Sequence, residues 1–68
     1  MSSEYTSGEH QIVVRVTRSS SMAWSAHITS TDGMSSYYIV PLPNANSLAT
    51  AMDEAMAIAH LRHPPNSP

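Results

Sequence analysis

The stretch MAWSAHITSTDGMSSYYIVPL, residues 22–42, decides the fold. Its first part alternates apolar and polar side chains, with apolar positions at Met22, Trp24, Ala26 and Ile28. This period of two predicts a half-buried strand over residues 22–30. Asp32-Gly33 is a strong signal for a tight hairpin turn. We therefore expect residues 35–42 to form the returning strand, with Pro41 at a sheet edge or at the strand's end.

A third strand is expected before this hairpin. Residues 11–18 (QIVVRVTR) are rich in β-branched side chains, which favour strands, and Ser19–Ser21 forms a turn. A three-residue serine turn sets Val14 opposite Ala26, and a two-residue turn at Asp32-Gly33 sets Ala26 opposite Ile39. Both hairpins then direct their apolar residues to one face, and a slip of one residue would break this agreement.

A helix is expected after the sheet. Residues 44–47 (NANS) offer capping side chains, and Thr50-x-x-Asp53 also has capping-box spacing, so the helix start is open between these two places. A spacing of three to four residues places one apolar stripe on the helix: Leu48, Met52, Ala55, Met56 and Ala59, with Ala51 and Ile58 beside it. The expected fold is α+β: a three-stranded antiparallel meander in the order 1-2-3, with one C-terminal helix packed on one face (β-β-β-α).

The folded part is expected to be one small domain, residues 9–63. Residues 1–8 (MSSEYTSG) are small and polar and predict a flexible N-terminal arm. Residues 64–68 (PPNSP) cannot continue a helix and predict a disordered tail. Trp24, in the central strand, is expected to be the main aromatic residue of the core.

Size and composition favour self-association. A chain of 68 residues buries little apolar surface, so its folded state is expected to be only marginally stable. The absence of cysteine excludes stabilisation by disulfides. The net charge is −2, and three arginines are the only Lys or Arg cations, so nucleic acid is not an expected partner. No apolar run reaches the length of a membrane span, and a cytoplasmic protein is expected.

Three candidate chemical sites are weighed against structural roles. His60 and His63 are spaced to lie on neighbouring helical turns, but a zinc site needs further ligands, and favourable contact with the helix C-terminus explains them as well. Asp53 and Glu54 point in different directions on a helix and do not form an acid/base pair. The serine-rich segments lack a positioned base and oxyanion donors. We expect no enzyme, no metal site and no cofactor.

The sheet face away from the helix is the expected interface. A single helix cannot cover both faces of a sheet, and the predicted register leaves one face with a mixture of apolar, aromatic and hydrogen-bonding groups. Tyrosine and arginine are enriched at protein interfaces. The candidate interface residues are Val13, Arg15, His27, Tyr38, Val40 and Leu42.

The segment YYIVPLPNANSLATAMDEAMAIA, residues 37–59, is similar to part of the HicB-type antitoxins, which have a partial double-stranded-RNA-binding-domain shape. The similarity spans a third of the chain, and Pro43-Asn44 stands where that family has a Pro-Gly-Cys type turn. What the resemblance implies is dimerisation and a protein partner.

Three functions follow as hypotheses. The first is a small non-enzymatic interaction protein that acts as a homodimer through the open sheet face or an edge strand. The second is a small-ligand or metal binder that uses His27, Tyr38, His60 or His63. The third is a protein similar to the HicB antitoxins that binds a protein partner.

Overall fold

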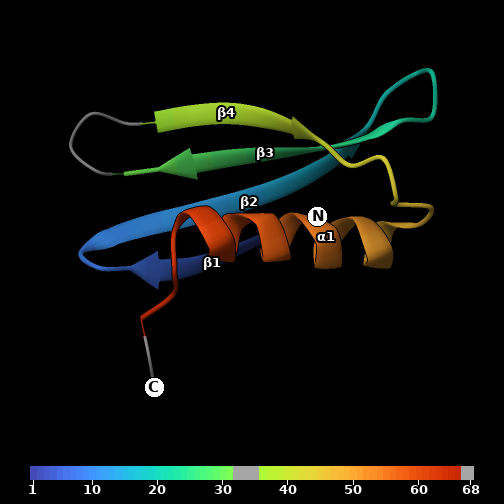
Figure 1. Cartoon of the computed structure of the whole chain (residues 1–68). Helices are drawn as coiled ribbons and strands as arrows, with labels where there is room; N and C mark the ends of the chain where they lie inside the picture. Colours follow the sequence, from blue (N-terminus) through green and yellow to red (C-terminus); the bar gives the residue numbers. More distant parts are fainter. Residues whose placement is uncertain (32–35, 67–68) are drawn as a thin grey trace.

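The computed structural model describes residues 1–31 and 36–66 as an antiparallel sheet with one helix across it (Figure 1). The strands follow one another in the order β1-β2-β3-β4. The elements are β1 (Ser2–Ser7), β2 (His10–Arg18), β3 (Trp24–Ser30), β4 (Ser36–Pro41) and α1 (Leu48–Arg62). The predicted α+β class, with an antiparallel meander followed by a C-terminal helix, is confirmed.

The sheet has four strands, so the prediction of three is wrong. The additional strand is β1, which lies in the segment expected to be a flexible arm and pairs with β2 along its whole length. The sequence of β1 does not show the alternating apolar pattern of a strand, because Tyr5 is its only large apolar residue. The usable signal was Gly8, which has a φ of +63° in the turn before β2. Glycine adopts this left-handed conformation without steric cost, as tight hairpins require.

The β2–β3 hairpin has a longer loop than predicted. Arg18 lies opposite Trp24, and Val14 lies opposite Ile28 instead of Ala26. The Ser19 N–H donates to the Ala23 carbonyl, which closes a loop in which Met22 adopts a left-handed φ of +68°. The register is displaced by two residues, and an even displacement returns each side chain to the same face of a strand. The predicted inward residues of β2 therefore remain buried.

The β3–β4 hairpin is displaced by one residue, and this displacement inverts β4. Ala26 lies opposite Val40, not Ile39, and Ile28 lies opposite Tyr38. An odd displacement moves every side chain of a strand to the other face. The predicted Asp32-Gly33 turn lies outside the described residues, so the displacement is visible only through the pairing of the strands.

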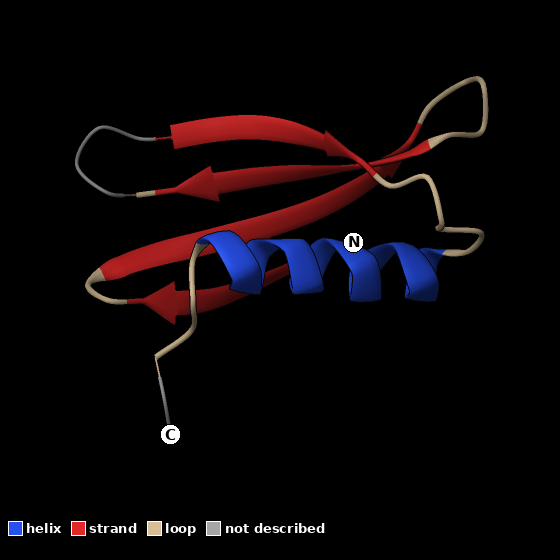
Figure 2. Ribbon diagram, in the orientation of Figure 1, coloured by secondary structure: helices blue, strands red, loops and turns tan. Residues whose placement is uncertain are grey.

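The helix packs through alanines against the two central strands. Ala51, Ala55 and Ala59 recur every four residues and are fully buried, because side chains at this spacing share one face. They share one buried cluster with the inward residues of β2 and β3, among them Val14 and Ile28. Figure 2 shows the helix lying across one face of the sheet. The predicted stripe is correct in its alanines, while Met52, Met56 and Ile58 pack partly buried beside them and Leu48 is exposed.

Side chains cap the N-terminus of the helix, and the segment that follows the helix is bonded to β1. Ser47 is the N-cap: its Oγ accepts from the Thr50 N–H at 3.2 Å, and the Thr50 Oγ1 accepts from the Ser47 N–H at 3.0 Å. Beyond the helix, the Asn66 N–H donates to the Thr6 carbonyl of β1 at 3.0 Å. Residues 64–66 of the expected disordered tail therefore lie along β1, and residues 67–68 lie outside the described part.

Trp24 has a more peripheral place than predicted. It faces the helix side of the sheet but begins β3, where it is half-buried and packs against the core from one end. The Arg18 guanidinium lies 5.6 Å from the centre of its ring. Within the described residues, no helix is long and apolar enough to cross a lipid bilayer.

Candidate functional site

The sheet face opposite the helix carries no covering layer from the described chain (Figures 1 and 2). We call it the open face. Alternation along each strand assigns its side chains. They are Ser2, Glu4 and Thr6 of β1, Gln11, Val13, Arg15 and Thr17 of β2, Ser25, His27 and Thr29 of β3, and Tyr37, Ile39 and Pro41 of β4.

The inversion of β4 corrects half of the candidate interface residues. Val13, Arg15 and His27 lie on the open face as predicted. The predicted place of Tyr38, Val40 and Leu42 on that face is wrong: Leu42 is buried, and Tyr38 and Val40 pack half-buried on the helix side.

The sequence did not place Tyr37, Ile39 and Pro41 on the open face; Tyr37 and Ile39 are each 56% exposed there. The sequence shows two adjacent tyrosines followed by two adjacent β-branched residues, so either member of each pair fits either face. Only the length of the β3–β4 connection distinguishes them. Along β4 the open face therefore carries Tyr37, Ile39 and Pro41 in place of the expected Tyr38, Val40 and Leu42.

His27 lies at the centre of a hydrogen-bonded row across three strands. Its Nδ1 is 2.5 Å from the Tyr37 hydroxyl on β4, and its Nε2 is 3.1 Å from the Thr17 hydroxyl on β2. A neutral imidazole has one donor and one acceptor nitrogen, so each hydroxyl can complement one of them. The row fixes the orientation of the imidazole and holds the Tyr37 ring diagonally across the sheet.

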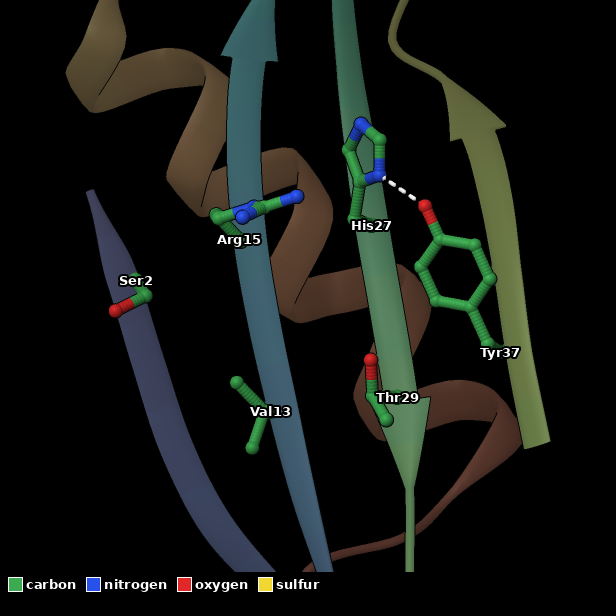
Figure 3. Close-up of a pocket in the computed structure, with 6 residues that line it drawn as sticks. All are labelled: Ser2, Val13, Arg15, His27, Thr29 and Tyr37. Carbon is green, nitrogen blue, oxygen red and sulfur yellow. Dashed lines mark hydrogen bonds between the residues drawn. The ribbon is translucent and has the colours of Figure 1, made fainter. Parts of the chain in front are cut away.

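Beside this row lies a shallow hollow of about 250 Å³ (Figure 3). Its lining comes from all four strands: Ser2, Val13, Arg15, His27, Thr29 and Tyr37. Figure 3 shows the Arg15 side chain extending from β2 toward His27. The hollow thus combines one guanidinium with hydroxyl groups, which is a donor set suited to a carboxylate or phosphate group.

The second group of polar and aromatic side chains lies on the helix side, at the C-terminal end of α1. The Tyr5 hydroxyl donates to the His63 carbonyl at 2.7 Å, and the Tyr5 ring meets His60 edge-on with centres 4.7 Å apart. The Tyr38 hydroxyl lies 2.9 Å from the His63 Nε2, and the Arg62 guanidinium lies 5.0 Å from the Tyr38 ring centre. This group connects the helix end to both edge strands.

The two histidines at this end of the helix have different partners: the His60 ring contacts Tyr5, and the His63 ring lies beside the Tyr38 hydroxyl. Within residues 1–31 and 36–66, no three His, Cys, Asp or Glu side chains are grouped so that they could hold a metal ion. Burial, and next the neighbouring Tyr38, raise the pKa of Tyr5 above its ordinary value of 10.0. A phenol that stays protonated keeps donating to the helix end, which is a structural role.

Comparison with protein families, with curated proteins and with solved structures finds no match to this chain.

Proposed function

We propose that this protein is a small non-enzymatic interaction protein that acts as a homodimer in the cytoplasm. The observation that carries the proposal is the open face, on which Tyr37 and Ile39 are exposed side by side on β4 without a covering layer. Aromatic residues are enriched at interfaces, and large exposed apolar side chains that cluster on one surface mark interaction sites. Helix α1 already covers the opposite face.

The chemistry of the open face supports binding more than catalysis. Both ring nitrogens of His27 lie within hydrogen-bond distance of hydroxyl groups, so the imidazole is held by the sheet itself. The same row holds the Tyr37 ring in one position. A preoriented aromatic side chain loses little conformational entropy on binding, which favours its use in an interface.

Solution mass and dilution test this proposal. Sedimentation equilibrium is expected to give twice the 7.4 kDa of the chain at tens of micromolar. Because association stabilises the folded state by mass action, the midpoint of thermal unfolding is expected to rise with protein concentration. A 7.4 kDa particle whose unfolding midpoint is independent of concentration would refute the homodimer.

The hollow beside His27 supports a second candidate function, the binding of a small anion. Arg15 supplies the charge, and Ser2, Thr29 and Tyr37 contribute hydroxyl groups around it. We expect inorganic phosphate to shift the NMR signals of the His27 ring. The Arg15→Gln variant should abolish this shift, whereas Arg18→Gln should retain it because Arg18 lies beside Trp24, outside the hollow. Equal shifts in both variants would exclude the hollow as an anion site.

A further inference from the structure

We propose that the second copy of this chain joins at the free edge of β4, so that two sheets become one continuous antiparallel sheet across a two-fold axis. This inference rests on the proposed homodimer and names the surface that forms it. It follows from the direction of the backbone groups, from the composition of β4, and from the contrast with the other edge of the sheet.

The backbone of β4 presents unpaired groups at regular positions. In an antiparallel ladder, residues alternate between pairs that exchange hydrogen bonds and pairs that do not. The Leu42 N–H donates to the Trp24 carbonyl, so Val40 and Tyr38 are the next residues that bond to β3. The N–H and C=O groups of Tyr37 and Ile39 therefore point away from β3. Within the described residues, no other backbone group bonds to them.

The side chains of β4 suit an apolar junction on both faces. The strand reads SYYIVP and carries no charge over its six residues. Natural proteins protect edge strands with charges, prolines or a covering segment, and an apolar uncharged edge is prone to pair with another strand. Pro41 ends β4 and lacks an N–H on the free side, so the outward donors of the junction are Tyr37 and Ile39, while the Pro41 carbonyl can still accept.

The other edge is protected by two of these devices, a covering segment and a charge. The Val16 N–H donates to the Met1 carbonyl, so the backbone groups of Ser2, Glu4 and Thr6 point outward from β1. The Thr6 carbonyl already accepts from Asn66, and Glu4 places a charge at the middle of the strand. Of the two sheet edges in the described part of the chain, β4 is the one that carries no charge and accepts no bond from another segment.

The two-fold axis is best placed at Ile39. With Ile39 opposite Ile39 of the second copy, the two residues exchange both of their backbone hydrogen bonds. Tyr37 then lies opposite Pro41 of the second copy, and its N–H can donate to that carbonyl. On the helix side, Tyr38 lies opposite Val40 of the second copy. Aromatic and β-branched residues are favourable cross-strand partners. A two-fold arrangement uses the same strand in both chains and closes the assembly at a dimer.

Backbone substitution separates the dimer from the fold. Ile39→Pro removes an N–H that the monomer does not use, so far-UV circular dichroism should be retained while the mass falls to 7.4 kDa. Glu4→Pro is the matched control, because its N–H also points outward but on β1, and it should remain dimeric. A folded Ile39→Pro dimer would refute the β4 junction and leave the homodimer in place. A monomeric wild type would refute both.

Crosslinking provides a test that does not depend on the proline variant. The chain has no cysteine, so Ile39→Cys introduces a single thiol. Directly opposed residues lie about 5.5 Å apart between Cα atoms, which is within the range for a disulfide. Mild oxidation should convert most of this variant to a covalent dimer. Leu61→Cys, at an 82% exposed helix position, should stay unlinked. Equal crosslinking of the two variants, or none at residue 39, would overturn the proposal.

Discussion

Strands β1 and β4 are the two edges of one sheet, and they differ in what lies against them. The outer side of β1 receives Asn66, while Ser7 donates to the Pro64 carbonyl and Tyr5 to the His63 carbonyl. No comparable backbone bond reaches the outer side of β4 within the described chain. The comparison teaches that the C-terminal residues cover the Thr6 end of the β1 edge and leave the β4 edge available.

The two edges also differ in sequence character. β1 is polar and contributes one large side chain, Tyr5, to the helix side. β4 is apolar on both faces, with Tyr37 and Ile39 exposed and Tyr38 and Val40 half-buried. Because β1 is polar and contacts the C-terminal residues, whereas β4 is apolar with a free edge, mutations in the two strands should have different effects. The following variants test this difference, beginning with the largest effect.

Isoleucine truncations give the largest contrast. Ile28 is fully buried, and Ile28→Ala is expected to cost about 2–5 kcal/mol, enough to unfold a small domain. Ile39 is exposed on the neighbouring strand, so Ile39→Ala should leave the fold intact and weaken the dimer. Urea unfolding and sedimentation equilibrium measure the two effects. A large loss of stability in dilute Ile39→Ala protein would show that Ile39 belongs to the core.

Tyrosine truncations compare the two edges directly. Tyr5→Ala removes the packing on His60 and the bond to the helix end, and we expect it to lower the free energy of unfolding by about 1–3 kcal/mol. Tyr37→Ala removes an exposed ring and should cost less than about 1 kcal/mol while raising the dissociation constant of the dimer. A larger stability loss in Tyr37→Ala, with weaker dimerisation in Tyr5→Ala, would contradict the roles assigned to the two edges.

Alkaline pH should reduce the contribution of Tyr5, on β1, to the stability of the folded protein. Because the pKa of Tyr5 is raised in the folded state, its contribution to stability is complete below pH 10.0 and is lost as the pH rises through the folded-state value. Tyr5→Phe removes the hydrogen bond to His63 and should cost about 1 kcal/mol at neutral pH. Urea titrations across this range should show the difference from wild type shrinking above pH 10.0. A constant difference would contradict the role assigned to this phenol.

The smallest effect is expected at the chain end. The Asn66 side chain accepts from the Gly8 N–H at 2.7 Å and donates to the Gly8 carbonyl at 3.1 Å, and both bonds are exposed. Asn66→Ala should lower stability by no more than about 1 kcal/mol and should speed hydrogen exchange at the Gly8 amide. Unchanged exchange at Gly8 would mean that the tail does not protect this turn.

Periodicity predicted the helix, its alanine face and the inward residues of the central strands, because each of these depends on a repeat within one segment. It could not predict the orientation of β4, since YYIV has apolar side chains at consecutive positions and only the β3–β4 connection sets its register. The predicted length of the serine loop between β2 and β3 was also wrong, but it displaced the register by two residues, so the side chains kept their predicted faces. The predicted face of a strand was therefore wrong where the displacement was odd and correct where it was even.

The candidate site was predicted only where it lies on the central strands. Val13, Arg15 and His27 were placed on the correct face, whereas Tyr37 and Ile39 were missed with the register of β4. Ser2 was missed for another reason: β1 gains its place by pairing with β2 and by contacts with the distant C-terminus. The strand propensity of a short polar segment cannot predict such long-range bonds.

Hydrogen exchange at the Ile39 amide tests the central claim most directly. This N–H points away from β3 and should exchange rapidly in the monomer, but it forms a bond to the second copy in the proposed dimer. The account predicts slow exchange at concentrations where the chain is dimeric and rapid exchange on dilution, with the outward Glu4 amide of β1 rapid throughout. Rapid exchange at Ile39 in a fully dimeric sample would contradict it.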